Sequence, residues 1–169
     1  RLLDIGTGSG CIALSLLREL PRARALAVDF SEAALEVARM NAATLGLESR
    51  IDFLLSRWLD AVPEDASFDA IISNPPYVAP SERSSLSPEV REFEPGLALF
   101  AEGADDLSSY RAIVGQVGNR LKPSGLLAFE VGLGQATRVA DLLRDTEFAS
   151  VETVDDLAGI ARVVLARRN

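Results

Sequence analysis

Short apolar runs alternate along this chain with longer segments in which apolar residues recur every three or four positions. The runs have the length of strands buried on both faces, and the longer segments have the spacing of amphipathic helices. Strands are predicted at residues 2–5, 23–29, 51–55, 68–73, 126–131, 150–156 and 161–168, and helices at residues 11–20, 31–46, 107–121 and 135–143. This alternation predicts an α/β fold with a mostly parallel sheet covered on both faces.

Residues that begin and end secondary structure stand at the borders of these elements. Ser31 is a good helix N-cap, Gly46 a good helix stop, and Pro21 ends the first predicted helix. Residues 122–125, Lys-Pro-Ser-Gly, are expected to form a turn before the fifth strand. No helix separates the last two strands, so we expect a seven-stranded sheet with an antiparallel final hairpin in a single domain, residues 1–169.

One long segment, residues 78–104, interrupts the alternation. It is rich in Pro, Ser and Glu, and a loop of this length in a compact domain is usually functional or disordered. Because it directly follows the strand at residues 68–73, we predict an insertion on the substrate side that covers or admits a substrate. An acidic surface loop is the alternative.

Composition and charge narrow the possible functions. Lys and Arg number 17 against 25 Asp and Glu, and the net charge of −8 disfavours a broad nucleic-acid surface. The absence of His removes the commonest general base and metal ligand, and no metal site is expected. Cys11 is the single cysteine, so we expect a reducing compartment, the cytoplasm. No apolar run approaches the roughly 18 residues that cross a bilayer, and a monomer without membrane contact is expected.

The stretch LDIGTGSG places Gly6, Gly8 and Gly10 at the turn from the first strand to the first helix. Glycine allows the backbone to adopt positive φ and to approach a ligand closely. The third glycine stands one position too early for the dinucleotide fingerprint G-x-G-x-x-G, which disfavours a dehydrogenase. The pattern D-x-G-x-G-x-G instead resembles that of S-adenosylmethionine methyltransferases.

Asp29 ends the second predicted strand, where its carboxylate can accept hydrogen bonds from two ribose hydroxyls. The alternative for the glycine turn alone is a purely structural turn, and the alternative for Asp29 alone is a solvated carboxylate. Together, in one strand–helix–strand unit, the glycine turn and Asp29 predict a site for a nucleoside cofactor.

The sequence SNPPYVAP follows the strand at residues 68–73. Its two prolines cannot donate to a strand ladder and make the backbone rigid. We expect Asn74 to lie beside the glycine turn, because ligands bind beyond the carboxyl ends of such strands. The side-chain carbonyl of Asn74 and the backbone carbonyl of Pro75 can hold the two N–H bonds of a planar nitrogen, and Tyr77 offers a flat wall.

This arrangement suits methyl transfer to an amide or an aromatic amine by positioning, without an imidazole base. A plain turn that ends the strand is the alternative interpretation of these residues. The position after a buried strand, downstream of the glycine turn and Asp29, favours the functional interpretation.

Six stretches resemble the HemK/PrmC family of glutamine N5-methyltransferases in order and spacing: LDIGTGSGCIAL, VDFSEAALEVARMNA, DAIISNPPYV, EPGLALFAEGADDLSSYRAIV, FEVGLGQA and DLAGIARVV. The resemblance runs over essentially the whole chain. Asn-Pro-Pro-Tyr alone is shared with adenine-N6 and guanine-N2 methyltransferases. The stretch from Glu94 to Val114 and the DLAGIAR ending are more particular to the glutamine family.

The resemblance implies a class-I, Rossmann-like methyltransferase that uses S-adenosylmethionine and releases S-adenosylhomocysteine. The implied substrate is the glutamine in the Gly-Gly-Gln loop of peptide chain release factors, with no direct contact to nucleic acid. The implied cofactor contacts are the ribose with Asp29, the adenine with Phe30, and the methionine end with the glycine turn, Gly6, Thr7, Gly8, Ser9 and Gly10.

The resemblance also assigns the residues around the substrate. Asn74, which would face the cofactor as well, and Pro75 would hold the glutamine amide. Pro76 and Tyr77 would line its slot. Three acids near the expected site, Glu94, Glu102 and Glu130, are interpreted as structural or solvated charges, with Glu130 the best candidate for a supporting role.

The chain departs from the family pattern in three ways. Arg57 stands where the family usually has an acid near the adenine, and Trp58 after it is either an adenine contact or a core or surface aromatic. Asp106 replaces a usual Gly. We also expect that the family's small helical N-terminal domain, which helps to bind the release factor, is missing.

Two other functions stay open. A nucleic-acid amino-methyltransferase acting on adenine or guanine is disfavoured by the net charge and by the stretches after Tyr77. A non-catalytic module that binds S-adenosylmethionine would result if Arg57 or the missing domain abolished activity.

Overall fold

The computed structural model describes residues 1–78, 99–100, 105–146 and 148–169. The strands are β1 (Leu2–Ile5), β2 (Ala25–Asp29), β3 (Ile51–Leu55), β4 (Phe68–Ser73), β5 (Leu121–Glu130), β6 (Phe148–Asp155) and β7 (Ala161–Arg168). The helices are α1 (Cys11–Glu19), α2 (Glu32–Thr44), α5 (Ser108–Val117) and α6 (Ala136–Arg144), with short 3₁₀ turns η1 (Glu48–Arg50) and η3 (Gly118–Arg120). Ser31 caps α2 as predicted, because its side chain accepts the Ala34 N–H at 3.3 Å.

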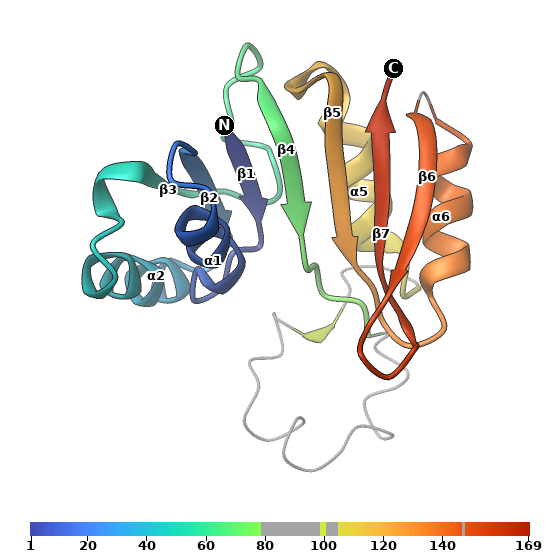
Figure 1. The fold of residues 1–169 in the computed structure, drawn as a ribbon, viewed down its shortest axis with the longest axis horizontal. Helices are drawn as coiled ribbons and strands as arrows, with labels where there is room; N and C mark the ends of the chain where they lie inside the picture. The colour runs from blue at the N-terminus through green and yellow to red at the C-terminus, as the bar shows by residue number, and fades with distance from the viewer. Residues whose placement is uncertain (79–98, 101–104, 147) are drawn as a thin grey trace.

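These strands form one seven-stranded sheet with the order β3-β2-β1-β4-β5-β7-β6 (Figure 1). Strands β1 to β5 pair in parallel, and β7 is antiparallel to both β5 and β6. The predicted mostly parallel sheet with an antiparallel final hairpin is therefore confirmed.

The start of β5 differs from the prediction. Leu121 pairs with Phe68 and Leu126 with Ala70, so residues 122–125 bulge out between two positions of β4 that are only two residues apart. The turn predicted at residues 122–125 corresponds to this register shift. Because Leu121 already pairs with β4, the turn lies inside β5 and not before it. Helix α5 correspondingly ends at Val117, before the predicted end at residue 121.

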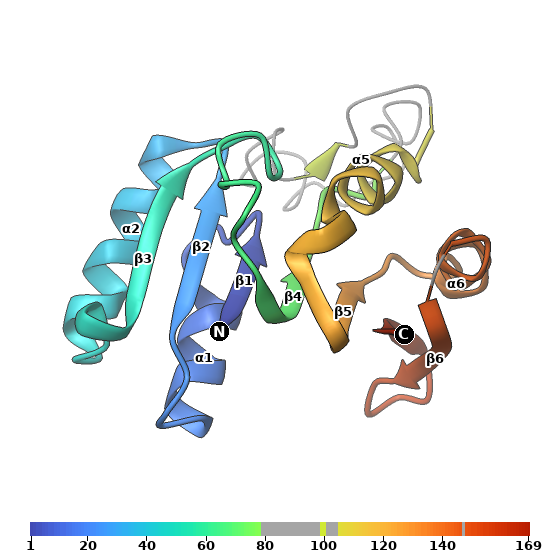
Figure 2. The ribbon, with the colours of Figure 1, turned by 90° about the horizontal axis from the view of Figure 1, so that it is seen from above.

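The sheet separates two apolar cores. Helices α1 and α2 cover one face, and α5 and α6 cover the other (Figures 1 and 2). In β1 the side chains alternate: Leu2 packs with α1, whereas Leu3 and Ile5 pack in the core of the α5–α6 face. We call these the α1–α2 core and the α5–α6 core.

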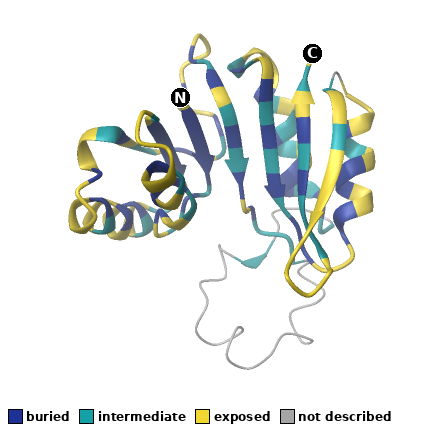
Figure 3. Ribbon diagram, in the orientation of Figure 1, coloured by how far each residue is buried: buried dark blue, intermediate teal, exposed yellow. Residues whose placement is uncertain are grey.

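Burial falls from the centre of the sheet toward its edge. All four residues of β1 are buried, whereas most residues of the edge strand β6 are exposed (Figure 3). Along the described residues, no helix combines the length and the apolar composition that a membrane crossing requires.

The α1–α2 core gives a direct test of the packing. Leu17 of α1 is fully buried at 0% exposure, whereas Leu20, at the end of the same helix, is 46% exposed. We expect Leu17→Ala to lower the free energy of unfolding by about 2–5 kcal/mol, because it leaves a cavity. Leu20→Ala should cost less than about 1 kcal/mol in the same urea titration. Equal costs for the two variants would contradict this packing.

Candidate active site

The candidate site lies where β1 and β4 end side by side. Ile5 pairs with Ser73, and the buried Ser73 hydroxyl donates to the Ile5 carbonyl at 2.8 Å. The next residues, Gly6 and Asn74, therefore leave neighbouring strands at the same edge of the sheet. A methyl group built on Gly6 would lie 4.0 Å from the backbone oxygen of Asn74. The structure thus brings the glycine turn and the Asn-Pro-Pro-Tyr segment together.

Gly8 and Gly10 need to be glycine for different reasons. Both have positive φ, 56° at Gly8 and 82° at Gly10. A Cβ on Gly10 would lie 3.0 Å from Leu14 Cδ1 and 3.3 Å from Ala38 Cβ, so its lack of a side chain allows the start of α1 to pack closely against α2. A Cβ on Gly8 would meet no described atom within 4 Å. The backbone at Gly8 is therefore open to a ligand.

The Asp29 carboxylate fastens the glycine turn to the end of β2. One oxygen accepts the Gly8 N–H at 2.8 Å, and the other accepts the Ser31 N–H at 2.8 Å. Each carboxylate oxygen can accept more than one hydrogen bond, so Asp29 keeps capacity for hydroxyl donors of a ligand.

Exposed apolar side chains flank Asp29 at the ends of β2 and β3. Phe30 is 58% exposed, and Leu55, which pairs with Asp29, is 49% exposed. Large apolar side chains that are this exposed offer a surface on which a flat, apolar ring of a ligand can pack. Trp58 is partly buried, packs against the α5–α6 core and has a positive φ of 49°. Arg57 beside it is exposed.

The carbonyls of Pro76 and Tyr77 are bound by the protein itself. The Ser109 hydroxyl donates to the Pro76 carbonyl at 2.8 Å, and the Gln135 amide donates to the Tyr77 carbonyl at 2.9 Å. These bonds come from the start of α5 and from the residue before α6. Both helices therefore hold the end of the Asn-Pro-Pro-Tyr segment.

The start of that segment is different. Asn74 is exposed and Pro75 is buried. Over the described parts of the chain, neither the Asn74 side chain nor the Pro75 carbonyl has a hydrogen-bond partner. Within the described residues, two acceptors beside the glycine turn are thus unbound.

The Tyr77 ring packs against Gly132. A Cβ on Gly132 would lie 2.8 Å from Tyr77 Cδ2, so no larger residue fits beside the ring in this position. The sequence analysis did not identify Gly132 or Gln135, which both lie in the stretch FEVGLGQA. That stretch is one of the six that resemble the glutamine methyltransferase family, and this resemblance was the sequence signal that pointed to the two residues.

Asp4 is a third residue outside the set predicted from the sequence. It is 1% exposed, and one carboxylate oxygen accepts the Thr7 hydroxyl at 2.7 Å and the Ala13 N–H at 3.2 Å. Its other oxygen has no partner among the described residues. Burial raises the pKa of Asp4 to about 6, against the lowering effect of these two bonds. Asp4 joins the glycine turn to α1, and its first place in D-x-G-x-G-x-G was the sequence signal.

The predicted insertion begins beside this site, and its residues 99 and 100 return to Val78. The Val78 N–H donates to the Leu99 carbonyl at 3.0 Å, and Val78 forms a parallel bridge with Phe100. Most of the insertion, with Glu94 and Glu102, lies outside the described residues. The backbone carbonyl of Glu130 accepts the Tyr110 hydroxyl at 3.1 Å, so this residue has a structural contact through its main chain.

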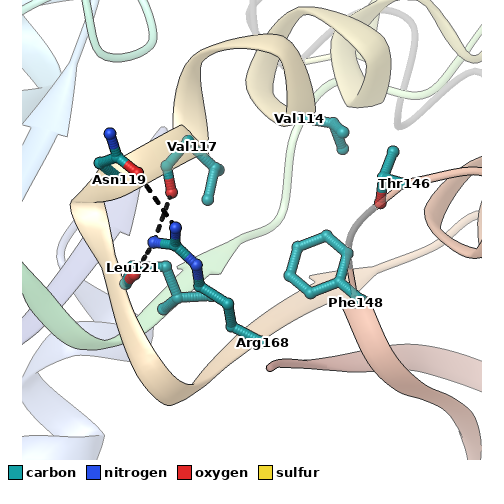
Figure 4. Close-up of a pocket in the computed structure, with 8 residues that line it drawn as sticks. Val114, Val117, Asn119, Leu121, Thr146, Phe148 and Arg168 are labelled. Carbon is teal, nitrogen blue, oxygen red and sulfur yellow. Dashed lines mark hydrogen bonds between the residues drawn. The ribbon is translucent and has the colours of Figure 1, made fainter.

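A cavity of about 190 Å³ lies at the opposite end of the sheet, near η3 and the start of β6 (Figure 4). Arg168 lines it, and its guanidinium already donates to the carbonyls of Gly118 and Leu121 and to the Asn119 side chain. The remaining lining is mostly apolar. None of the residues predicted for the site lies there, so the glycine turn remains the candidate site.

Comparisons with known proteins agree with this geometry. The profile of the family described as Methyltransferase small domain matches residues 1–89. The chain is 49% identical over 166 residues to the release factor glutamine methyltransferase of Cereibacter sphaeroides, covering 98% of this chain and 59% of that protein. It is 46% identical over 168 residues to the protein of the same name from Rhodospirillum rubrum, covering 99% and 51%.

A solved structure extends the comparison to the fold. Ribosomal protein L11 methylase from Lactobacillus delbrueckii subsp. bulgaricus matches with a TM-score of 0.69 at 20% identity, covering 99% of this chain and 70% of that one. At this identity the match shows the fold alone. The curated relatives confirm the resemblance found in the sequence, and this chain spans between half and three fifths of their length.

The raised pKa of Asp4 predicts a pH dependence of stability. The folded state holds the Asp4 proton more tightly than the unfolded state, where the pKa is about 3.9. The stabilisation that the bound Asp4 proton gives the folded state is therefore fully present below pH ~4 and is lost as the pH rises through about 6. Relative to Asp4→Asn, we expect the wild-type free energy of unfolding to fall by about 2 kcal/mol between pH 4 and 7.

Urea titrations of both proteins across this pH range measure the difference. Leu20→Ala, which removes no titratable group, is the control and should differ from wild type by the same amount at every pH. A difference between wild type and Asp4→Asn that does not change with pH would contradict the assignment.

Proposed function

Because the chain belongs to the methyltransferase small domain family, we propose that it transfers a methyl group from S-adenosylmethionine to a glutamine side-chain nitrogen. The proposed substrate is the Gly-Gly-Gln loop of peptide chain release factors. The names of the relatives support this choice. One observation carries it: within the described residues, Asn74 and Pro75 offer two unbound acceptors beside the glycine turn.

The residues present fit S-adenosylmethionine. The open backbone at Gly8 admits the methionine end, and Asp29 can accept the ribose hydroxyls. Phe30, with its exposed ring, and Leu55 provide an apolar surface for the adenine. Trp58 is a further candidate for the adenine contact, from the neighbouring connection between β3 and β4.

When bound, S-adenosylmethionine supplies an electrophilic methyl group on a positively charged sulfur. The chain's own residues orient the acceptor. The Asn74 side-chain carbonyl and the Pro75 carbonyl each accept one N–H of the glutamine amide, which fixes the nitrogen and increases its electron density. The proton that the methylated nitrogen loses passes to water. Tyr77 lines the slot for the planar amide. The fixed φ of the two prolines preorganises these acceptors, so positioning performs most of the catalysis.

Two alternatives predict different products. A nucleic-acid amino-methyltransferase could use the same acceptors for an exocyclic amine, but the net charge of −8 disfavours a nucleic-acid partner. A non-catalytic module would bind S-adenosylmethionine without transfer. We favour the protein substrate, and we place the reaction in the cytoplasm because the single cysteine suits a reducing compartment.

The substrate is tested by incubating the chain with methyl-labelled S-adenosylmethionine and one of three acceptors. These are a release factor, the same factor with its loop Gln replaced by Ala, and RNA. We expect label on the intact release factor only. Label on the Gln→Ala factor, or on RNA alone, would refute the assignment, and binding of S-adenosylmethionine without transfer would favour the non-catalytic module.

The role of Asn74 is tested by Asn74→Ala. Loss of one preorganised acceptor should lower kcat by about 10²- to 10³-fold, while the Kd for S-adenosylmethionine stays within about threefold. Asn119→Ala, an exposed asparagine in η3 at the other end of the sheet, is the matched control. If Asn74→Ala kept full turnover, the proposed amide binding would be wrong.

A further inference from the structure

The Gln135 side chain lies at the centre of a hydrogen-bond network that the proposed chemistry does not use directly. It is 6% exposed, and its Nε2 donates to the Tyr77 carbonyl and to Asp106 Oδ2, both at 2.9 Å. Its Oε1 accepts the Gly132 N–H at 3.0 Å and lies 3.2 Å from the Tyr110 hydroxyl, whose single hydrogen it shares with the Glu130 carbonyl. All four hydrogen-bonding positions of the amide are therefore filled.

The partners determine which way the Gln135 amide points. A backbone carbonyl and an ionised carboxylate can only accept, so they must face the NH₂ group. The Gly132 N–H can only donate, so it must face the oxygen. Burial raises the pKa of Tyr110, which keeps its hydroxyl protonated and able to donate. No rotated amide satisfies the same neighbours.

Asp106 is itself held from α6. Arg138 donates to both of its oxygens, at 2.7 and 2.8 Å, in a bidentate pair. This guanidinium, with Gln135, keeps the pKa of Asp106 below its usual range. Asp106 is therefore an anionic acceptor that fixes the second N–H of Gln135. The Asp106 side chain thus completes the network around the Gln135 amide.

The network acts on the segment that carries the proposed substrate acceptors. With Ser109 bound to the Pro76 carbonyl and Gln135 bound to the Tyr77 carbonyl, both carbonyls that follow Pro75 are fixed. The φ angles of the two prolines are fixed by their rings. Little freedom remains for the direction of the Pro75 carbonyl.

We propose that Gln135, locked by Asp106, is a positioning residue that aims the Pro75 carbonyl at the substrate amide. This proposal rests on the proposed function. Gln135 contacts neither the substrate nor the cofactor in this account, and it acts through the Tyr77 carbonyl.

Gln135→Glu tests the proposal because it keeps the size and the acceptor oxygen but removes both donors. A carboxylate would then face the Tyr77 carbonyl and Asp106. We expect kcat/KM for the release factor to fall by about 10²-fold, with the Kd for S-adenosylmethionine unchanged. Adding Asp106→Asn turns that partner into a donor, restores one hydrogen bond and should recover at least about tenfold.

The matched control removes a different aspartate that also pairs with an arginine of α6. Asp141 pairs with Arg144 at 2.8 Å on the exposed side of the helix. Asp141→Asn should leave kcat/KM unchanged and should not rescue Gln135→Glu. Equal rescue by Asp141→Asn and Asp106→Asn would overturn the proposal, because a general charge effect would then explain it.

A second measurement does not depend on methyl transfer. The chain has two tyrosines, Tyr77 and Tyr110, and both belong to this network. With fluorotyrosine incorporated, the ¹⁹F spectrum has two protein resonances, which Tyr77→Phe assigns. We expect Gln135→Glu to shift or broaden the Tyr77 resonance and Asp141→Asn to leave it in place.

The two readouts separate the two proposals. If the wild-type chain methylates no release factor, the proposed function fails, and the Tyr77 resonance still tests the positioning. If Gln135→Glu does not fold, Asp106→Gly, which removes one of the four bonds, takes its place. A Tyr77 resonance identical to wild type in the folded variant overturns the positioning role.

Discussion

The candidate site depends on the parallel pairing of β1 with β4, which the buried bond from Ser73 to the Ile5 carbonyl completes. Because the two strands end in register, the glycine turn and the Asn-Pro-Pro-Tyr segment leave the sheet next to one another. A slip of one residue would reverse every side chain of one strand and move Asn74 away from Gly6. The register of two short strands therefore determines whether a donor and an acceptor can meet.

The two sides of the site are held by different means. On the side of the glycine turn, carboxylates bind backbone N–H groups: Asp29 holds Gly8 and Ser31, and the buried Asp4 holds Ala13. On the substrate side, side-chain donors bind backbone carbonyls. Acceptors thus fix the glycine turn through its N–H groups, and donors fix the substrate segment through its carbonyls.

The sequence predicted the repeating elements and the two motifs because both depend on local patterns. Hydrophobic periodicity identified the strands, and Gly6 to Gly10 and Asn74 to Tyr77 are short contiguous stretches. It did not predict the beginning of β5, where the pairing of Leu121 with Phe68 outweighs the local turn preference of residues 122–125. Nor did it predict the role of Gln135, whose partners at positions 77, 106, 110 and 132 meet only in the folded chain.

The division of the interior into two cores has a consequence for how this protein can evolve. Side chains of the α1–α2 core and the α5–α6 core lie on opposite faces of the sheet and form separate clusters. The costs of substitutions in residues that share no contacts usually add, so neither core needs compensating changes in the other. Lineages can therefore repack the α5–α6 face, which supports the substrate segment, while the face behind the glycine turn keeps its ancestral packing.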